Sequence, residues 1–231
     1  MEAARGVLLE RYPNADAAIV GGSVVRGEGS PTSDLDLLVV IGGLSAPFRE
    51  SFTSHEWPVQ ASVNNLQSWR HLFDTNVRRR RPFVVRLCSE GVVLLDKDGL
   101  GTKIKRQAEQ TLASGPPPMT HEELALARYV VTDLLDDLVG ARSQPEAYYV
   151  AAELSGAAVN LLLGSRRRWL ATGKWLDREL RALDPNRAEG MVAAQEALYR
   201  AGDGGPLTKW VTAVLDEVGG RLFDGYRQEL P

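Results

Sequence analysis

Cysteine and histidine are scarce in this 231-residue chain, which holds one cysteine and three histidines. A single thiol excludes an intramolecular disulfide framework and a cysteine-rich zinc site. The histidines, His55, His71 and His121, are scattered and lack the spacing of metal ligands. Cys88 ends the mostly apolar run 84–88. We therefore expect a buried, unreactive thiol there.

A surplus of positive charge and long apolar runs are also missing. The formal net charge is -3, whereas a nucleic-acid-binding protein usually carries a basic excess, so we expect no nucleic-acid partner. No segment approaches the roughly 18 consecutive apolar residues that a membrane span needs. The N-terminus lacks a signal-peptide pattern. These absences predict a cytoplasmic protein with no membrane partner.

The first half of the chain has the pattern of a mixed α/β domain. Apolar or alternating runs predict strands, and helical spacing with Pro or Gly boundaries predicts helices. The expected strands are 15–20, 35–41, 57–63 and 92–95, and the expected helices are 3–11 and 66–79.

A proline triplet in Ser114–Pro118 separates this part from a second half of different character. Thr120 and Glu123 have the spacing of a capping box that opens a long helix. Further helices are expected at 148–163, 184–200 and 207–226. The sequence therefore predicts an α/β (α+β) domain with a mixed sheet over 1–113, followed by an all-helical bundle over 119–231.

The most informative motif is Gly21-Gly22-Ser23, separated by ten residues from Asp34-Leu35-Asp36. Glycine allows a sharp turn and the close approach of a phosphate, and Ser23 adds a hydroxyl donor. A helix beginning near Ser23 would also favour an anion there. Asp34 and Asp36 are two residues apart on a strand, so both side chains point to one face. A divalent cation would relieve their repulsion.

The intervening loop, residues 26–33, is polar and glycine-rich. We expect it to fold around a nucleotide, with Ser33 among the binding residues.

Residues 17–40 resemble the signature of the DNA polymerase beta nucleotidyltransferase superfamily, in its small bacterial branch. The resemblance implies that Asp34 and Asp36 bind Mg²⁺ and that Gly22 and Ser23 hold the triphosphate of ATP or another nucleotide. The helical half resembles, by its layout, kanamycin nucleotidyltransferase and related antibiotic adenylyltransferases. It implies transfer of a nucleoside monophosphate, AMP in the first instance, to a hydroxyl of a small acceptor such as an aminoglycoside.

Gln60 departs from the family pattern, which often has a third carboxylate on the neighbouring strand. Its amide oxygen is an uncharged ligand for Mg²⁺ and a poor base. Three interpretations stay open: activity with two carboxylates and a base from elsewhere, a nucleotide-binding relative without catalysis, and an engineered replacement of glutamate. Glu56 is nearby, and we interpret it as a surface carboxylate.

The helical half supplies two further candidates. Asp133 and Asp137 lie four residues apart on one helix face, and the resemblance implies Asp137 as the base, with Asp133 lining the pocket. Lys174 is a candidate ligand of the triphosphate. Trp169 and Trp175 are better explained as helix-packing anchors, and the basic run 78–81 as a solvated helix end.

Two competing functions remain besides the enzyme. One is a nucleotide-binding module that does no chemistry. The other is an antitoxin-type enzyme that modifies a hydroxyl of a partner protein. The sequence leaves the oligomeric state open, a dimer included.

Overall fold

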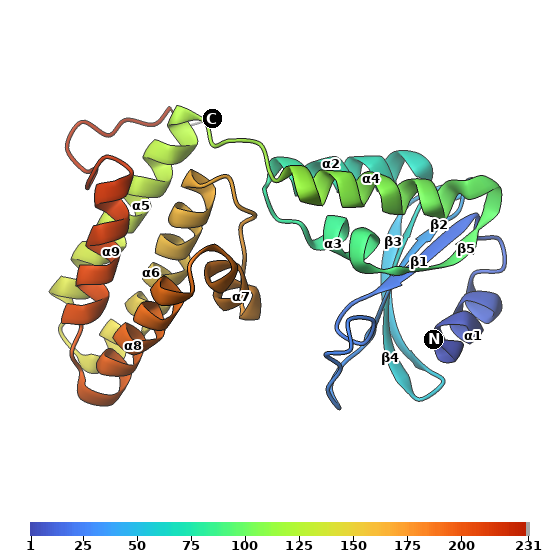
Figure 1. The fold of residues 1–231 in the computed structure, drawn as a ribbon, viewed down its shortest axis with the longest axis horizontal. Coiled ribbons are helices and arrows are strands. Elements are labelled where there is room, and N and C mark those ends of the chain that lie inside the picture. The colour runs from blue at the N-terminus through green and yellow to red at the C-terminus, as the bar shows by residue number, and fades with distance from the viewer. Residues whose placement is uncertain (230–231) are drawn as a thin grey trace. The chain divides into compact units, whose positions relative to one another are not determined.

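The computed structural model describes residues 1–229 and divides into two compact units, Met1–Pro116 and Pro117–Pro231 (Figure 1). The first unit contains, in chain order, α1 (Glu2–Arg11), β1 (Ala17–Gly21), β2 (Leu35–Val40), β3 (Phe48–Ser54), β4 (Trp57–Asn64), α2 (Leu66–Arg78), α3 (Phe83–Glu90), β5 (Val92–Asp96) and α4 (Leu100–Ser114). The second contains α5 (His121–Gly140), α6 (Gln144–Ser165), α7 (Lys174–Leu183), α8 (Pro185–Ala201) and α9 (Gly205–Glu217).

The first unit is built on a five-stranded sheet with the order β3-β4-β2-β1-β5. β2 and β4 are parallel, whereas the other neighbouring pairs are antiparallel, so the sheet is mixed. The register places Gly21 beside Asp36, and Asp36 beside Gln60. Because paired residues point to the same face, these three positions form one row across β1, β2 and β4.

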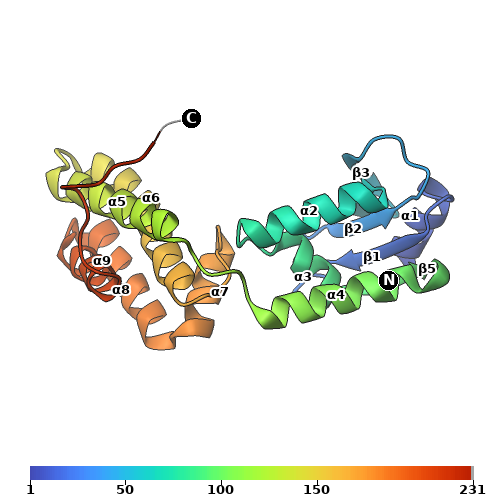
Figure 2. The ribbon, with the colours of Figure 1, turned by 90° about the horizontal axis from the view of Figure 1, so that it is seen from above.

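Alternating apolar residues on the strands bury both faces of this sheet. One face, which includes Val20, Leu37 and Val63, packs against Val7 and Leu8 of α1. The other face packs against α2, α3 and α4, which Figure 2 shows along the sheet. The row that contains Asp36 belongs to this second face, since Asp36 and the buried Leu38 are two residues apart on β2.

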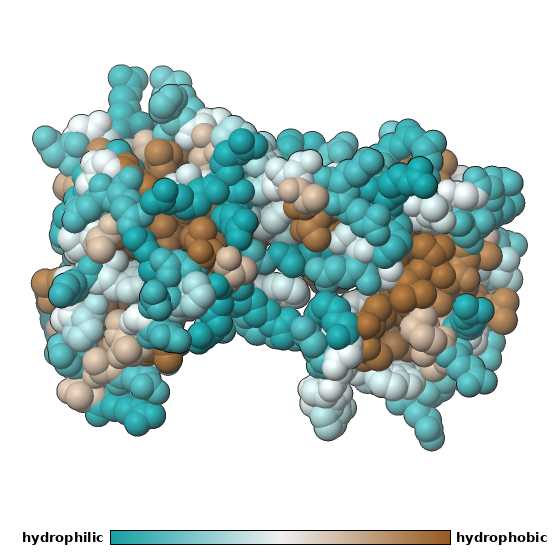
Figure 3. All heavy atoms as spheres, in the orientation of Figure 1, coloured by the Kyte–Doolittle hydropathy of each residue, from teal (hydrophilic) through white to brown (hydrophobic). Residues whose placement is uncertain are grey.

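The α1 face is covered by one helix of 10 residues. Figure 3 shows apolar side chains gathered at the surface over β1, β5 and α1. Leu9 of α1 and Val92 of β5 are 74% and 40% exposed. The three-helix face is therefore the better covered of the two.

The second unit is a bundle whose core runs along α6. Leu154, Leu161, Leu162 and Leu163 of this helix are almost completely buried and belong to one apolar cluster with residues of the other four helices. Thr120 caps α5 through a capping box with Glu123, as its sequence spacing predicts. Within residues 1–229, no helix is both long and apolar enough to cross a membrane.

Most of the predicted elements are confirmed, but the last predicted helix is too long. The expected helix 207–226 ends at Glu217. Gly219 and Gly220 follow with φ of 104° and 79°, which a helix does not allow. Arg128 of α5 donates hydrogen bonds to both of their carbonyls. The chain is therefore turned onto α5 instead of continuing as a helix.

Cys88 is confirmed as a buried thiol. It lies on α3 with no exposed surface, and burial raises its pKa to about 12. Because the thiolate is the reactive form, such a group is unreactive at neutral pH.

Candidate functional site

Gly22 and Asp36 are packed against each other at the end of β1. Gly22 has a φ of 89°, and a Cβ atom placed there would lie 2.5 Å from Oδ2 of Asp36. A side chain at this position would therefore meet both backbone strain and a collision with the carboxylate. Gly21 is also confined, because its Cβ would lie 3.0 Å from both the Leu87 carbonyl oxygen and the Leu87 side chain on α3. The turn thus brings bare backbone to the Asp36 carboxylate.

The helix that we considered near Ser23 is absent. Residues 23–27 form turns, in which the Gly27 N–H donates to the Val24 carbonyl over 3.2 Å. The Glu28 N–H donates to the Ser23 carbonyl over 2.9 Å. Two glycines and the short polar loop favour this compact turn over a helix. A helix dipole is therefore not available to an anion at this position.

The loop brings Ser23 and Ser33 together from its two ends. Their hydroxyl oxygens are 2.9 Å apart, and the Ser30 N–H donates to the Ser33 hydroxyl over 2.8 Å. Ser30 and Thr32 add a hydroxyl contact of 3.1 Å. Both Ser23 and Ser33 are half-buried. A cluster of hydroxyls therefore lies at the mouth of the turn, next to Asp34.

Asp34 lies directly before β2, and Asp36 is its second residue. Both are half-buried, and Gln60 is exposed on the neighbouring strand in register with Asp36. Oxygen atoms of this kind fit Mg²⁺, which takes one or two carboxylates and completes its shell with phosphate and water. Within residues 1–229, no group of three or more His, Cys, Asp or Glu side chains is placed to hold a metal. The residues here that could hold a cation are the two aspartates, with the Gln60 amide on the neighbouring strand.

Glu56 does not supply the missing third carboxylate on this face. It is exposed in the turn between β3 and β4, with a φ of 64°, as expected of a surface residue.

The C-terminal end of α3 is packed tightly beside the turn. A Cβ atom on Gly91 would lie 2.4 Å from the Leu87 carbonyl oxygen and 2.7 Å from that of Val20, so helix and strand approach closely here. The Lys105 ammonium donates to the carbonyls of Ser89 and Gly91 over 2.6 and 2.7 Å. These contacts anchor the end of the helix to β1 and α4.

An ion-pair network that sequence reasoning missed joins the loop to the end of α3. Glu90 accepts from Arg26 of the loop over 3.2 Å and from Arg86 of α3 over 3.4 Å. The i,i+4 spacing of Arg86 and Glu90 is visible in the sequence. Arg26 is 64 residues from Glu90, so only the fold reveals their contact.

The remaining predicted site residues lie in the helical unit. Asp133 and Asp137 are exposed on α5. The adjacent Asp136 is paired with Arg221. Lys174 is exposed at the start of α7. Trp169 is buried and Trp175 packs against the bundle core, as expected of packing anchors.

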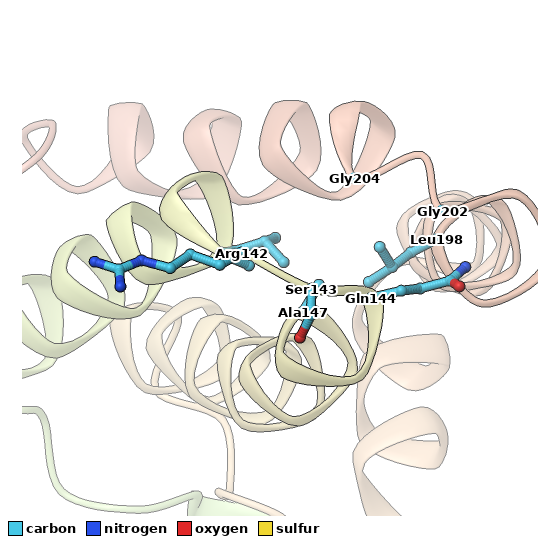
Figure 4. A pocket seen from close by; sticks show the side chains of 9 residues that line it. Arg142, Ser143, Gln144, Ala147, Leu198, Gly202 and Gly204 are labelled. Carbon is cyan, nitrogen blue, oxygen red and sulfur yellow. The ribbon is translucent and has the colours of Figure 1, made fainter.

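A pocket of about 350 Å³ lies within the helical unit, at the α5–α6 turn and the α8–α9 turn. Figure 4 shows Ser143 and Gln144 at the start of α6 in its wall, across from Leu198. Leu138 lines it, but Asp137 and Lys174 do not. This pocket is therefore separate from the predicted site residues.

The basic run 78–81 differs in one position from the solvated helix end that we expected. Arg78, Arg79 and Arg81 are exposed, but Arg80 is only 7% exposed. Arg80 has a φ of 56° in the turn between α2 and α3, which directs it inward. It is therefore part of the fold of this turn.

Comparison with known proteins identifies the type of the N-terminal region. Residues 1–61 match the family model described as "Nucleotidyltransferase domain". No curated protein matches the chain. Among solved structures, the chain is similar to a nucleotidyltransferase-like protein from Exiguobacterium sibiricum 255-15, with 16% identity, a TM-score of 0.49 and coverage of 94% of this chain and 73% of that chain.

The family match and the mixed sheet together confirm the predicted fold class. The match also supports nucleotidyl transfer as the general class of reaction, with a nucleoside triphosphate as substrate. The resemblance of the helical half to kanamycin nucleotidyltransferase stays a prediction.

Proposed function

We propose that this protein transfers a nucleoside monophosphate from a nucleoside triphosphate, ATP in the first instance, to a hydroxyl of a small molecule. The contact of Gly22 with the Asp36 carboxylate carries the proposal, because it joins a glycine turn to an acidic pair. A triphosphate with its bound cation needs both features at one place.

The turn would hold the triphosphate. Gly22 presents backbone without a side chain, and Ser23 and Ser33 present hydroxyls 2.9 Å apart. Hydroxyls and backbone N–H groups are suitable donors for phosphate oxygens. Lys174 is proposed as an additional point charge for the phosphates.

Asp34 and Asp36 would hold Mg²⁺, with the Gln60 amide oxygen as an uncharged neighbour. The bound cation would neutralise the triphosphate and the charge that develops as the leaving group departs. The two carboxylates would also orient the α-phosphate toward the attacking hydroxyl.

Asp137 is proposed as the base, on the resemblance of the helical half. The acceptor oxygen forms a bond to the α-phosphorus while the bond from that phosphorus to the pyrophosphate oxygen breaks. The hydroxyl proton passes to the Asp137 carboxylate, and pyrophosphate leaves. The acidic surface with Asp133 favours a cationic acceptor, such as an aminoglycoside.

The test measures pyrophosphate release with each of the four nucleoside triphosphates, Mg²⁺ and a panel of aminoglycosides. We expect turnover with at least one pair of substrates, and a loss on the order of 100-fold or more when Asp34→Ala and Asp36→Ala are combined. Asp137→Asn should lower kcat more than it changes KM. Equal release by the wild type and the double variant for every pair would overturn the proposal.

Gln60 favours one alternative, a nucleotide-binding protein without catalysis. The residue stands in register with Asp36, where the resemblance leads us to expect a carboxylate. Calorimetry that shows triphosphate binding, together with no pyrophosphate release, would support this alternative.

Gln60→Glu discriminates between the two functions. The added carboxylate would repel Asp36, so the variant should be less stable than the wild type without Mg²⁺ and recover with it. A rise in turnover would indicate a lost ligand, whereas unchanged turnover would show that two carboxylates suffice.

A further inference from the structure

The loop between Gly22 and Asp34 carries the groups proposed for phosphate binding, yet it contains no helix or strand. Its internal contacts are hydroxyl and backbone hydrogen bonds and one ion pair, between Arg26 and Glu28, among exposed or half-buried residues. Such contacts exchange readily with water. The position of Ser23 and Ser33 therefore depends on what ties the loop to the rest of the unit.

Glu90 is placed to connect the loop to the rest of the unit. Its carboxylate contacts Arg26 at 3.2 Å and Arg86 at 3.4 Å, one oxygen for each arginine. The side chains are 27%, 21% and 19% exposed, so the network is partly shielded from water. Partial burial strengthens an ion pair relative to a fully exposed one.

The two residues of this ion pair, Glu90 and Arg26, lie in elements that are anchored to different degrees. Glu90 is the last residue of α3, which is fixed by the close approach at Gly91 and by Lys105 on the neighbouring carbonyls. Arg26 lies in the turn 23–27, three residues after Ser23. A contact between an anchored helix end and a loop without regular structure restrains the loop.

We propose that Glu90 is a positioning residue that holds the nucleotide loop, residues 22–34, against the end of α3 through Arg26, with Arg86 orienting the carboxylate. The proposal rests on the proposed function insofar as the loop binds a triphosphate. Glu90 itself touches neither substrate nor metal in this scheme.

The rate of trypsin cleavage after Arg26 reports on the Arg26–Glu90 contact without any nucleotide. Arg26 is followed by the exposed Gly27, and its guanidinium, which pairs with Glu90 and with Glu28, must leave both carboxylates to enter the protease. Glu90→Gln in the full chain should therefore speed cleavage after Arg26 by about three- to fivefold, detected as the fragment that begins at Gly27. Amide hydrogen exchange over the loop should accelerate by a similar factor.

Glu196→Gln is the matched control, because it removes a carboxylate from another i,i+4 pair, with Arg200 on α8. It should leave cleavage after Arg26 unchanged. Arg86→Gln keeps the Arg26–Glu90 contact and should give an intermediate rate, and it serves as the test should Glu90→Gln fail to fold. Unfolding midpoints within about 3 °C of the wild type establish that folded proteins are compared.

Nucleotide affinity tests the positioning role. Calorimetry with Mg-ATP should show about three- to fivefold weaker binding to Glu90→Gln, while the control binds as the wild type does. Cleavage and exchange rates in Glu90→Gln that equal those of the wild type would show that Glu90 does not hold the loop. Faster cleavage with unchanged affinity would overturn the positioning role.

Failure of the proposed function has a different signature. If the wild type binds no nucleoside triphosphate, the proposed function fails, and the cleavage and exchange rates alone still decide whether Glu90 holds the loop.

Discussion

Gly22 and Gly27 both have a positive φ angle but different surroundings. Their φ values are 89° and 75°, in the left-handed region that disfavours side chains. A Cβ at Gly22 would lie 2.5 Å from Oδ2 of Asp36, whereas a Cβ at Gly27 would meet nothing within 4 Å. A side chain at Gly27 would therefore cause backbone strain alone, whereas a side chain at Gly22 would also collide with Asp36.

Replacement of each glycine by alanine tests this distinction. Gly27→Ala should cost about 1 kcal/mol of stability from strain alone and leave triphosphate affinity near that of the wild type. Gly22→Ala should also push the Asp36 carboxylate away and weaken Mg-ATP binding by about tenfold or more. Calorimetry and thermal unfolding measure the two effects separately. Equal affinities of the two variants would show that the Gly22–Asp36 contact has no part in binding.

The candidate site residues differ in whether their partners lie close to them in the sequence. Gly22, Ser23, Asp34 and Asp36 could be proposed from the sequence because the turn and the strand lie within one short stretch. Glu90 could not be proposed in this way, since its partner Arg26 is 64 residues away and a glutamate ending a helix carries no special pattern.

Among the elements, α1 and β3 are joined by one polar cluster. Glu50 of β3 accepts from Arg11 of α1 over 2.6 Å and from the Tyr12 hydroxyl over 2.7 Å. The guanidinium of Arg11 lowers the pKa of Glu50, with a further contribution from Tyr12. Burial and the nearby Glu50 raise the pKa of Tyr12, which keeps its hydroxyl protonated as a donor.

This cluster predicts a pH-dependent contribution to stability. Because the folded pKa of Glu50 lies below its ordinary value of 4.5, the stabilisation is present above that value and is lost as pH falls through the folded pKa. Glu50→Gln should cost about 1 kcal/mol at neutral pH. The difference from the wild type should shrink as the pH falls below this ordinary value. Urea unfolding at several pH values measures it, and a difference that stays constant until the protein unfolds in acid would contradict the assignment.

Several elements with an apolar period were predicted, but α4 and α7 were not, although each packs an apolar face against the core of its unit. β2 and β4 are buried on one or both faces and were found. β3 was not predicted because it is an edge strand paired only with β4 and carries the polar run Arg49-Glu50-Ser51. α3 was missed because its eight residues are mostly apolar, and a short buried run does not distinguish helix from strand.

At the scale of the molecule, the two units have separate apolar cores. The clusters on the two faces of the sheet consist of residues before 113, and the bundle cluster consists of residues after 123. The proline-rich stretch 114–118 and the change from alternating to helical spacing are the sequence features that predict such a division. A unit with its own core can unfold as a unit.

We therefore expect two unfolding transitions, each sensitive to one carboxylate. Glu50 lies in the α/β unit, whereas Glu217 at the end of α9 contacts Arg166 and Arg187 in the bundle. These arginines lower the pKa of Glu217, Arg187 most strongly, so its stabilising contact is present at neutral pH and lost in acid. In calorimetry at pH 7, Glu50→Gln should shift one transition and Glu217→Gln the other, each by about 2–4 °C. A single transition that both variants shift alike would show that the two cores unfold together.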